Sequence, residues 1–135
     1  MRILVLGGTK FVGRAFVDAA RARGHALTLF NRGQEDPAAF PDVEQVRGDR
    51  TRGDGEGGFA PLSGRSFDAV VDTAAYLPQH ARAAAEFFAA RAEHLTFVSS
   101  VSVLADVSRP GHDESSAVKH PTPEQDAAIA ALDVD

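Results

Sequence analysis

Short apolar runs alternate with longer stretches of helical periodicity over the first hundred residues of the chain. Apolar runs without polar alternation are typical of strands that are covered on both faces. The predicted strands are residues 3–6, 26–30, 43–47, 67–72 and 94–99. Apolar residues spaced by three or four positions predict helices at residues 11–23 and 78–91. Gly24 follows the first helix at the position where a left-handed residue commonly ends one.

Strands that alternate with helices pair in parallel through right-handed crossovers, and the helices then cover both faces of the sheet. The pattern therefore predicts an α/β fold with a Rossmann-type, doubly wound parallel sheet of five strands. The residues at helical spacing are Val12, Phe16, Ala19, Ala20 and Arg23 in the first helix, and the expected apolar face of the second is Ala81, Ala84, Ala85 and Phe88.

Two segments interrupt this alternation. Residues 51–66 are rich in glycine and are predicted to form a loop, with one helical turn near 59–62. After Arg109 the chain becomes polar and contains three prolines within "RPGHDESSAVKHPTPEQD", so a loop is expected there. One or two turns of helix are expected within residues 126–135.

Three glycines crowd the junction between the first strand and the first helix. In "LGGTKFVG", Gly7 would make the turn out of the strand, and Gly8 would let backbone N–H groups approach a ligand. Gly13 lies one turn into the helix, where it would allow close packing against the sheet. The first N–H groups of a helix lack partners and carry partial positive charge, so this junction favours a phosphate. The motif alone is equally compatible with an ordinary turn, but its position predicts a dinucleotide site.

The end of the second strand bears on which dinucleotide would bind. NAD-binding folds place an acidic residue about 20 residues after the glycines, to bond the ribose hydroxyls. Asn31 occupies this place and Arg32 follows it. A guanidinium pairs with a 2′-phosphate, whereas a carboxylate would repel it, so NADP is favoured and NAD remains possible. Lys10 could approach the same phosphate, or it could simply be a solvated surface lysine.

The motifs together resemble a known family. "GGTKFVG" is similar to the "GGTGFIG" signature of the extended short-chain dehydrogenase/reductase superfamily, which includes the NAD-dependent epimerases and dehydratases. With Lys10 at the middle glycine and "LFNRG" after the second strand, the chain looks most like an atypical branch. That branch holds chloroplast stem-loop RNA-binding proteins and bacterial putative reductases. The resemblance also covers "RGD", "FDAVVDTAAY" and "FVSSVSVLAD".

The resemblance implies a role for particular residues. Asp49 would reach the adenine amino group, the small residues from Thr73 to Ala75 would pass the cofactor, and Ser100 would be the catalytic serine, with Ser102 as its neighbour. The positions implied to line the cofactor are Gly7, Gly8, Thr9, Lys10, Phe11, Val12, Gly13, Asn31, Arg32, Asp49, Thr73, Ala74 and Ala75. Residues 1–108 would form an incomplete dinucleotide-binding domain, and residues 109–135 would lead toward the catalytic and substrate-binding part.

The family's chemistry also requires a Tyr-x-x-x-Lys pair, which this chain does not contain. The one tyrosine, Tyr76, is followed four residues later by His80. In relatives the pair lies downstream of the serine, so the chain is expected to be truncated relative to the full fold. Three functions stay open: part of an epimerase, dehydratase or reductase acting on a hydroxyl-bearing substrate such as a nucleotide sugar, a non-catalytic NADP(H) sensor, and an RNA-binding protein.

Composition narrows these alternatives. The formal net charge of −5 makes nucleic acid an unlikely partner, because such proteins carry a basic face. There is no cysteine, and the five histidines show no metal-ligand spacing, so no metal site is expected. No apolar stretch is long enough for a membrane span, and a cytoplasmic location is expected. The apolar strand at 94–99 is expected at a sheet edge, where it could pair with a second copy of the chain.

Overall fold

The computed structural model describes residues 1–52 and 57–132. Residues 53–56 of the predicted loop and residues 133–135 of the predicted C-terminal helix lie outside the described residues. Two compact units are present, Met1–Val98 and Ser99–Leu132. They are described separately below.

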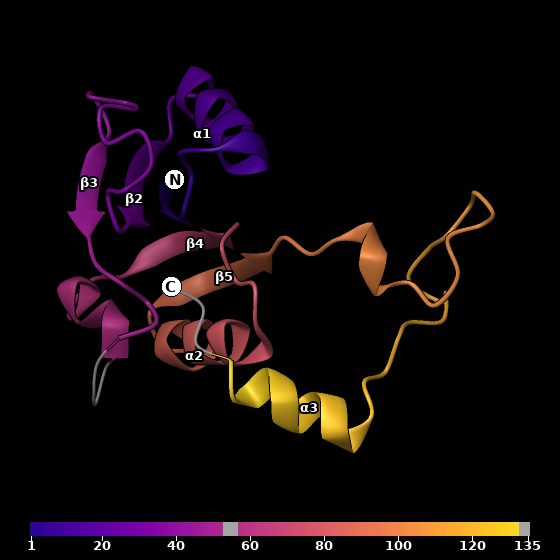
Figure 1. The fold of residues 1–135 in the computed structure, drawn as a ribbon. Coiled ribbons are helices and arrows are strands. Elements are labelled where there is room, and N and C mark those ends of the chain that lie inside the picture. Colours follow the sequence, from indigo (N-terminus) through magenta and orange to yellow (C-terminus); the bar gives the residue numbers. More distant parts are fainter. Residues whose placement is uncertain (53–56, 133–135) are drawn as a thin grey trace. The chain divides into compact units, whose positions relative to one another are not determined.

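The first unit is built on a five-stranded sheet whose strand order is β3-β2-β1-β4-β5 (Figure 1). Every neighbouring pair is parallel, and Ile3 of the central strand lies opposite Leu27 on one side and Ala69 on the other. The strands are β1 (Arg2–Leu6), β2 (Ala26–Asn31), β3 (Glu44–Arg47), β4 (Phe67–Asp72) and β5 (Ala92–Phe97). The predicted Rossmann-type parallel sheet is therefore confirmed. Its order reverses between β1 and β4, which is where such sheets bind ligands.

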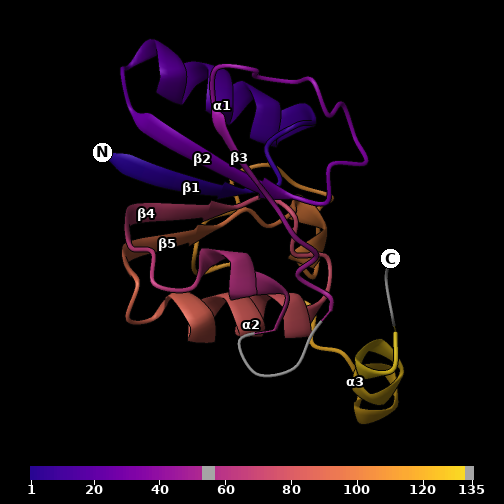
Figure 2. The ribbon, with the colours of Figure 1, turned by 90° about the vertical axis from the view of Figure 1, so that its left-hand side faces the viewer.

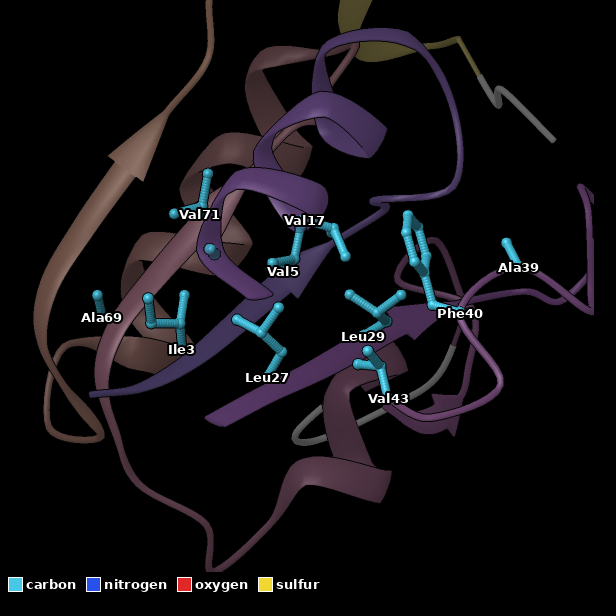
Figure 3. Packing of buried hydrophobic residues seen from close by; sticks show 11 residues of the cluster. Ile3, Val5, Val17, Leu27, Leu29, Ala39, Phe40, Val43, Ala69 and Val71 are labelled. Carbon is cyan, nitrogen blue, oxygen red and sulfur yellow. The ribbon is translucent and has the colours of Figure 1, made fainter. Parts of the chain in front are cut away.

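One helix covers each face of the sheet. Helix α1 (Phe11–Ala22) and helix α2 (Pro78–Phe88) lie on opposite sides of the strands in Figure 2. The core beneath α1 contains Val17 against Val5 and Leu29, as Figure 3 shows. The core beneath α2 also contains a short 3₁₀ helix, η1 (Gly57–Leu62), and brings together the aromatic rings of Phe30, Phe59, Phe67, Phe87 and Phe88.

The inward faces of the two helices agree only in part with the prediction, since Ala20, Ala84 and Phe88 are buried as predicted but other residues differ. In α1, Val17 and Ala20 are buried, whereas Val12 is 46% exposed. In α2, the buried residues are His80, Ala84, Phe87 and Phe88, and Ala85 is exposed. The reason is that alanine-rich helices offer several apolar stripes of similar quality, and the large Phe87 decides which one packs inward. Helix α2 also ends at Phe88, three residues earlier than predicted.

Strand β5 lies at the end of the strand order, beside β4 alone. It begins at Ala92, two residues earlier than predicted. The side chain of Phe97 is 45% exposed and that of Val98 is 37% exposed. The position of β5 agrees with the expected edge, and association of two copies through it stays a prediction.

The second unit is small and largely exposed. It begins with a 3₁₀ turn, η2 (Val101–Val103), and an isolated antiparallel bridge joins Leu104 to Val118. Helix α3 (Pro123–Ala130) follows, and the side chains of Thr122 and Gln125 cap its N-terminus reciprocally. Over the described residues of both units, no helix has the length and apolarity that crossing a membrane requires.

Candidate functional site

The turn between β1 and α1 depends on two glycines with left-handed backbone conformations. Gly7 has a φ of 98° and Gly8 a φ of 90°, which L-residues with a side chain rarely adopt. A Cβ on Gly7 would lie 2.8 Å from Thr73 Oγ1, so a side chain there would also clash with the loop after β4. The turn therefore requires bare backbone at the carboxyl edge of the sheet, where Gly7 is half-buried and Gly8 is buried.

Gly13 lets α1 approach this turn closely. A Cβ at Gly13 would lie 3.0 Å from the Cα of Gly8 and 2.8 Å from Thr73 Oγ1. The Thr73 hydroxyl and backbone N–H both donate to the carbonyl of Leu6, at 3.0 and 3.1 Å. These contacts join the glycine turn, the start of α1 and the loop after β4 into one packed arrangement.

The N-cap residue of helix α1 is Lys10, whose backbone is extended. The first helical hydrogen bond runs from the N–H of Arg14 to the carbonyl of Lys10, at 3.0 Å. The N–H groups from Phe11 to Gly13 therefore have no acceptor within the helix. Phe11 has a φ of 43° and is 91% exposed, and no acidic residue lies in the first turn. An anion is the ligand that this helix end favours.

Lys10 has a partner of its own in the loop after β2. Its ammonium Nζ lies 2.6 Å from Oε2 of Glu35, and both side chains are mostly exposed. One turn further along α1, Arg14 pairs with Asp36 at 3.0 Å. Two adjacent acidic residues thus hold this loop to α1, and a phosphate reaching Lys10 would have to displace Glu35.

Asn31 and Arg32 lie at the carboxyl end of β2, in different roles. The Asn31 side chain is occupied by protein contacts: its oxygen accepts from the N–H of Gly33 at 2.9 Å and from Arg47. Arg32 is exposed and, among the described residues, forms no ion pair. Asn31 therefore shapes the loop, and Arg32 offers a charged group to solvent.

Asp49, after β3, lies in the electrostatic field of Arg32. Burial raises the pKa of the Asp49 carboxyl, but hydrogen bonds from the Thr51 hydroxyl and N–H lower it more, with help from the charges of Arg32 and Arg52. The pKa of Asp49 is therefore below its ordinary value, and the group is ionised at neutral pH. Asp49 and Arg32 together make the β2–β3 side of the carboxyl edge polar and charged.

Two candidate functional residues, Arg50 and Asp72, were not predicted from the sequence. Arg50 follows Asp49, and Asp72 ends β4; their side chains form a buried two-pronged ion pair, with both N–O distances 2.8 Å. The visible signal was a carboxylate at the end of an apolar strand, since a buried aspartate requires a partner. The sequence near Asp72 does not identify Arg50 as this partner, because 22 residues separate the two.

Ser100 lies in the second unit, in the turn before η2. Its Oγ accepts the hydroxyl of Ser102 at 2.9 Å and the Ser102 N–H at 3.2 Å. Lys119 donates to the carbonyl of Ser102 at 3.0 Å. The two serines and Lys119 thus form an exposed polar cluster. In the described parts of the chain, no group of three or more His, Asp or Glu side chains is arranged to hold a metal.

A parallel sheet of this order, with a glycine turn at its reversal point, defines a Rossmann-type nucleotide-binding fold. A family model supports the same class at the level of sequence. The model for the NAD-dependent epimerase/dehydratase family matches residues 3–128, which is nearly the whole chain. The chain belongs to this family.

Solved structures with the same fold include several epimerases and a dehydratase. A UDP-galactose 4-epimerase superposes with a TM-score of 0.70 at 21% identity, covering 97% of this chain and 48% of that one. A UDP-glucose 4-epimerase from Stenotrophomonas maltophila, with bound NAD and formylated UDP-arabinopyranose, gives 0.69 at 17%, covering 96% and 46%. The dTDP-glucose 4,6-dehydratase from Bacillus anthracis, in complex with NAD, gives 0.66 at 18%, covering 97% and 47%.

The chain thus spans about half the length of these neighbours. At such low identity the likeness establishes the fold alone. Comparison with curated protein sequences finds no match.

Proposed function

We propose that this chain is the NADP(H)-binding part of an epimerase, dehydratase or reductase that acts on a hydroxyl-bearing substrate, with nucleotide sugars as the substrate class. The observation that carries the proposal is the glycine turn between β1 and α1. Gly7, Gly8 and Gly13 leave no room for side chains, and the helix end behind them favours an anion. The nucleotide-sugar epimerases and dehydratase with the same fold support the substrate class.

The residues present fit a dinucleotide that crosses the carboxyl edge of the sheet. The backbone from Gly8 to Gly13 would hold the pyrophosphate, as in other folds of this order. Arg32 and Asp49 would hold the adenosine end, and the loop from Thr73 to Ala75 would face the nicotinamide end. When bound, the nicotinamide ring of such a cofactor accepts or returns a hydride. The chain's own contribution at this edge is to bind and orient.

Arg32 supports the preference for NADP. It is an exposed guanidinium at the end of β2, and no acidic residue occupies positions 31 to 33 to repel a 2′-phosphate. Lys10 is a second cation near the same end, although Glu35 already neutralises it in part. A 2′-phosphate would therefore meet Arg32 first and would compete with Glu35 for Lys10.

The test is a titration of the chain with NADPH and with NADH, followed by nucleotide fluorescence or calorimetry. Arg32→Ala is expected to weaken NADPH binding about tenfold, the value of a charge-assisted hydrogen bond at an exposed site. NADH binding should change less than about twofold. Arg23→Ala, a change to an exposed arginine at the far end of α1, is the control and should affect neither. Equal losses for both nucleotides in Arg32→Ala would refute the 2′-phosphate assignment, and no binding by the unaltered chain would refute the function.

A non-catalytic NADP(H) sensor is the second candidate; it would need the same glycine turn but no Tyr-x-x-x-Lys pair, which these 135 residues do not contain. The intact mass of the protein, as its source cells make it, separates the two. A mass well above 14.3 kDa would indicate further chain, in which the pair should be sought. A mass of 14.3 kDa, with tight NADPH binding and no turnover of UDP-galactose or UDP-glucose, would favour the sensor.

A further inference from the structure

The ion pair between Arg50 and Asp72 is unlike the others in this protein. The Arg50 side chain is 10% exposed and the Asp72 side chain 2% exposed. In every other ion pair among the described residues, at least one side chain is more than half exposed. Both oxygens of Asp72 accept a guanidinium N–H, and the Arg50 guanidinium lies 5.5 Å from the centre of the Phe59 ring.

Stability alone does not account for this pair. Two buried charges lose their hydration, and an apolar pair of similar volume is often as stable or more stable. The pair is also incomplete, because Nε of Arg50 is buried and has no hydrogen-bond partner among the described residues. The segments that this buried, incompletely hydrogen-bonded pair holds together offer a better explanation for its presence.

The pair joins three segments at the carboxyl edge of the sheet. Arg50 directly follows Asp49, in the loop after β3. Asp72 directly precedes Thr73, and its Oδ1 also accepts the N–H of Ala74 at 3.0 Å. Arg50 donates a further hydrogen bond to the carbonyl of His80, in the first turn of α2, at 2.7 Å.

These segments flank the proposed cofactor from both ends. In the sheet, β3 and β4 are separated by β2 and β1, so no backbone ladder connects the loops that follow them. Asp49 lies on the adenosine side of the glycine turn, and Thr73 to Ala75 lie on the nicotinamide side. The Arg50–Asp72 pair is a direct, rigid link between the two sides.

We infer that Arg50 and Asp72 are positioning residues that set the spacing between the adenosine-side and nicotinamide-side loops for a ligand that spans both. The inference rests on the proposed function and deepens it. Preorganised loops spare a spanning ligand the cost of ordering them. A ligand that contacts the adenosine side alone does not depend on the spacing.

The experiment compares two ligands of different reach in the full 135-residue chain. NADPH spans both loops, and adenosine 2′,5′-bisphosphate reaches only the adenosine side. In Arg50→Met/Asp72→Leu, which replaces the charges with apolar groups of similar size, NADPH affinity should fall about tenfold. Affinity for the bisphosphate should change less than about twofold, and the melting temperature should stay close to that of the unaltered chain.

A second variant and a control make the result decisive. Arg50→Lys keeps the charge but cannot supply three N–H groups in a planar fork, so it should show the same selective loss of NADPH affinity. It provides the test if the double variant does not fold. Arg65→Met/Glu44→Leu removes another arginine–carboxylate pair of the same unit, which does not link the two loops, and should leave the affinity ratio unchanged.

Each outcome has one meaning. A selective loss for NADPH supports the inference. Equal losses for both ligands would overturn it, because the pair would then support the fold in general. No loss for either ligand would also overturn it, because the pair would then have no effect on binding. If the unaltered chain bound the bisphosphate and NADPH poorly from the start, the proposed function would fail and this inference with it.

Discussion

Gly13→Ala is the substitution for which the structure makes the sharpest prediction. Two opposing effects can be compared. Alanine is the better helix former by about 1 kcal/mol, and Gly13 has no left-handed backbone that would oppose the change. Against this, the new Cβ would lie 2.8 Å from Thr73 Oγ1 and 3.0 Å from the Cα of Gly8, and the second contact is with backbone.

Forcing a methyl group into a packed site costs about 1–3 kcal/mol. The net expectation, after the gain in helix propensity is subtracted, is a loss of up to about 2 kcal/mol of unfolding free energy, which lowers the melting temperature by up to about 8 °C in a chain of this size. Because the methyl group presses on the Gly8 backbone, NADPH affinity should fall as well. Circular dichroism melts and an NADPH titration measure the two effects.

Gly64→Ala is the matched control. Gly64 has a φ of 74° and no atom within 4 Å of a Cβ built there, so it isolates backbone strain from crowding. Its cost should be similar, about 1–2 kcal/mol, yet NADPH affinity should not change. Thr73→Ala in the Gly13→Ala background should recover part of the stability lost, as a favourable coupling in a double-mutant cycle. If Gly13→Ala raised the melting temperature and bound NADPH normally, the reasoning from close packing would be refuted.

Two further predictions concern ion pairs at the carboxyl edge and along β3. Glu35→Gln should tighten NADPH binding by up to about fivefold without affecting NADH, since it frees Lys10 from an exposed ion pair worth about 0.2–1 kcal/mol. Asp36→Asn leaves Lys10 paired and should not tighten NADPH binding. Equal effects of Glu35→Gln on NADPH and NADH would contradict this prediction. A hydrogen bond from Arg65 holds the pKa of Glu44 below its ordinary value of 4.5. Glu44 therefore stabilises the fold above pH 4.5 and loses this contribution as pH falls through the folded-state pKa, so Glu44→Gln should flatten the acid side of a stability-versus-pH curve.

Much of the fold could be predicted because its signals are local. A strand buried on both faces needs a continuous apolar run, and Phe67–Asp72 begins and ends as predicted. The turn after β1 needs glycine because Gly7 and Gly8 adopt left-handed conformations that are strained for any residue with a side chain. Gly24 ends α1 for the same reason, with a φ of 74°.

What the sequence by itself determined, then, is the order of strands and helices, the place of the glycine turn and the family signature. Only the tertiary structure decided that Val17 and Phe87 pack inward beside the predicted residues. It alone also decided that Lys10 meets Glu35 and that Arg50 meets Asp72. The physical reason is the range of the forces involved. Backbone conformation and apolar periodicity depend on neighbouring residues, whereas the partner of a charge depends on which loops the strand order brings to the same edge of the sheet.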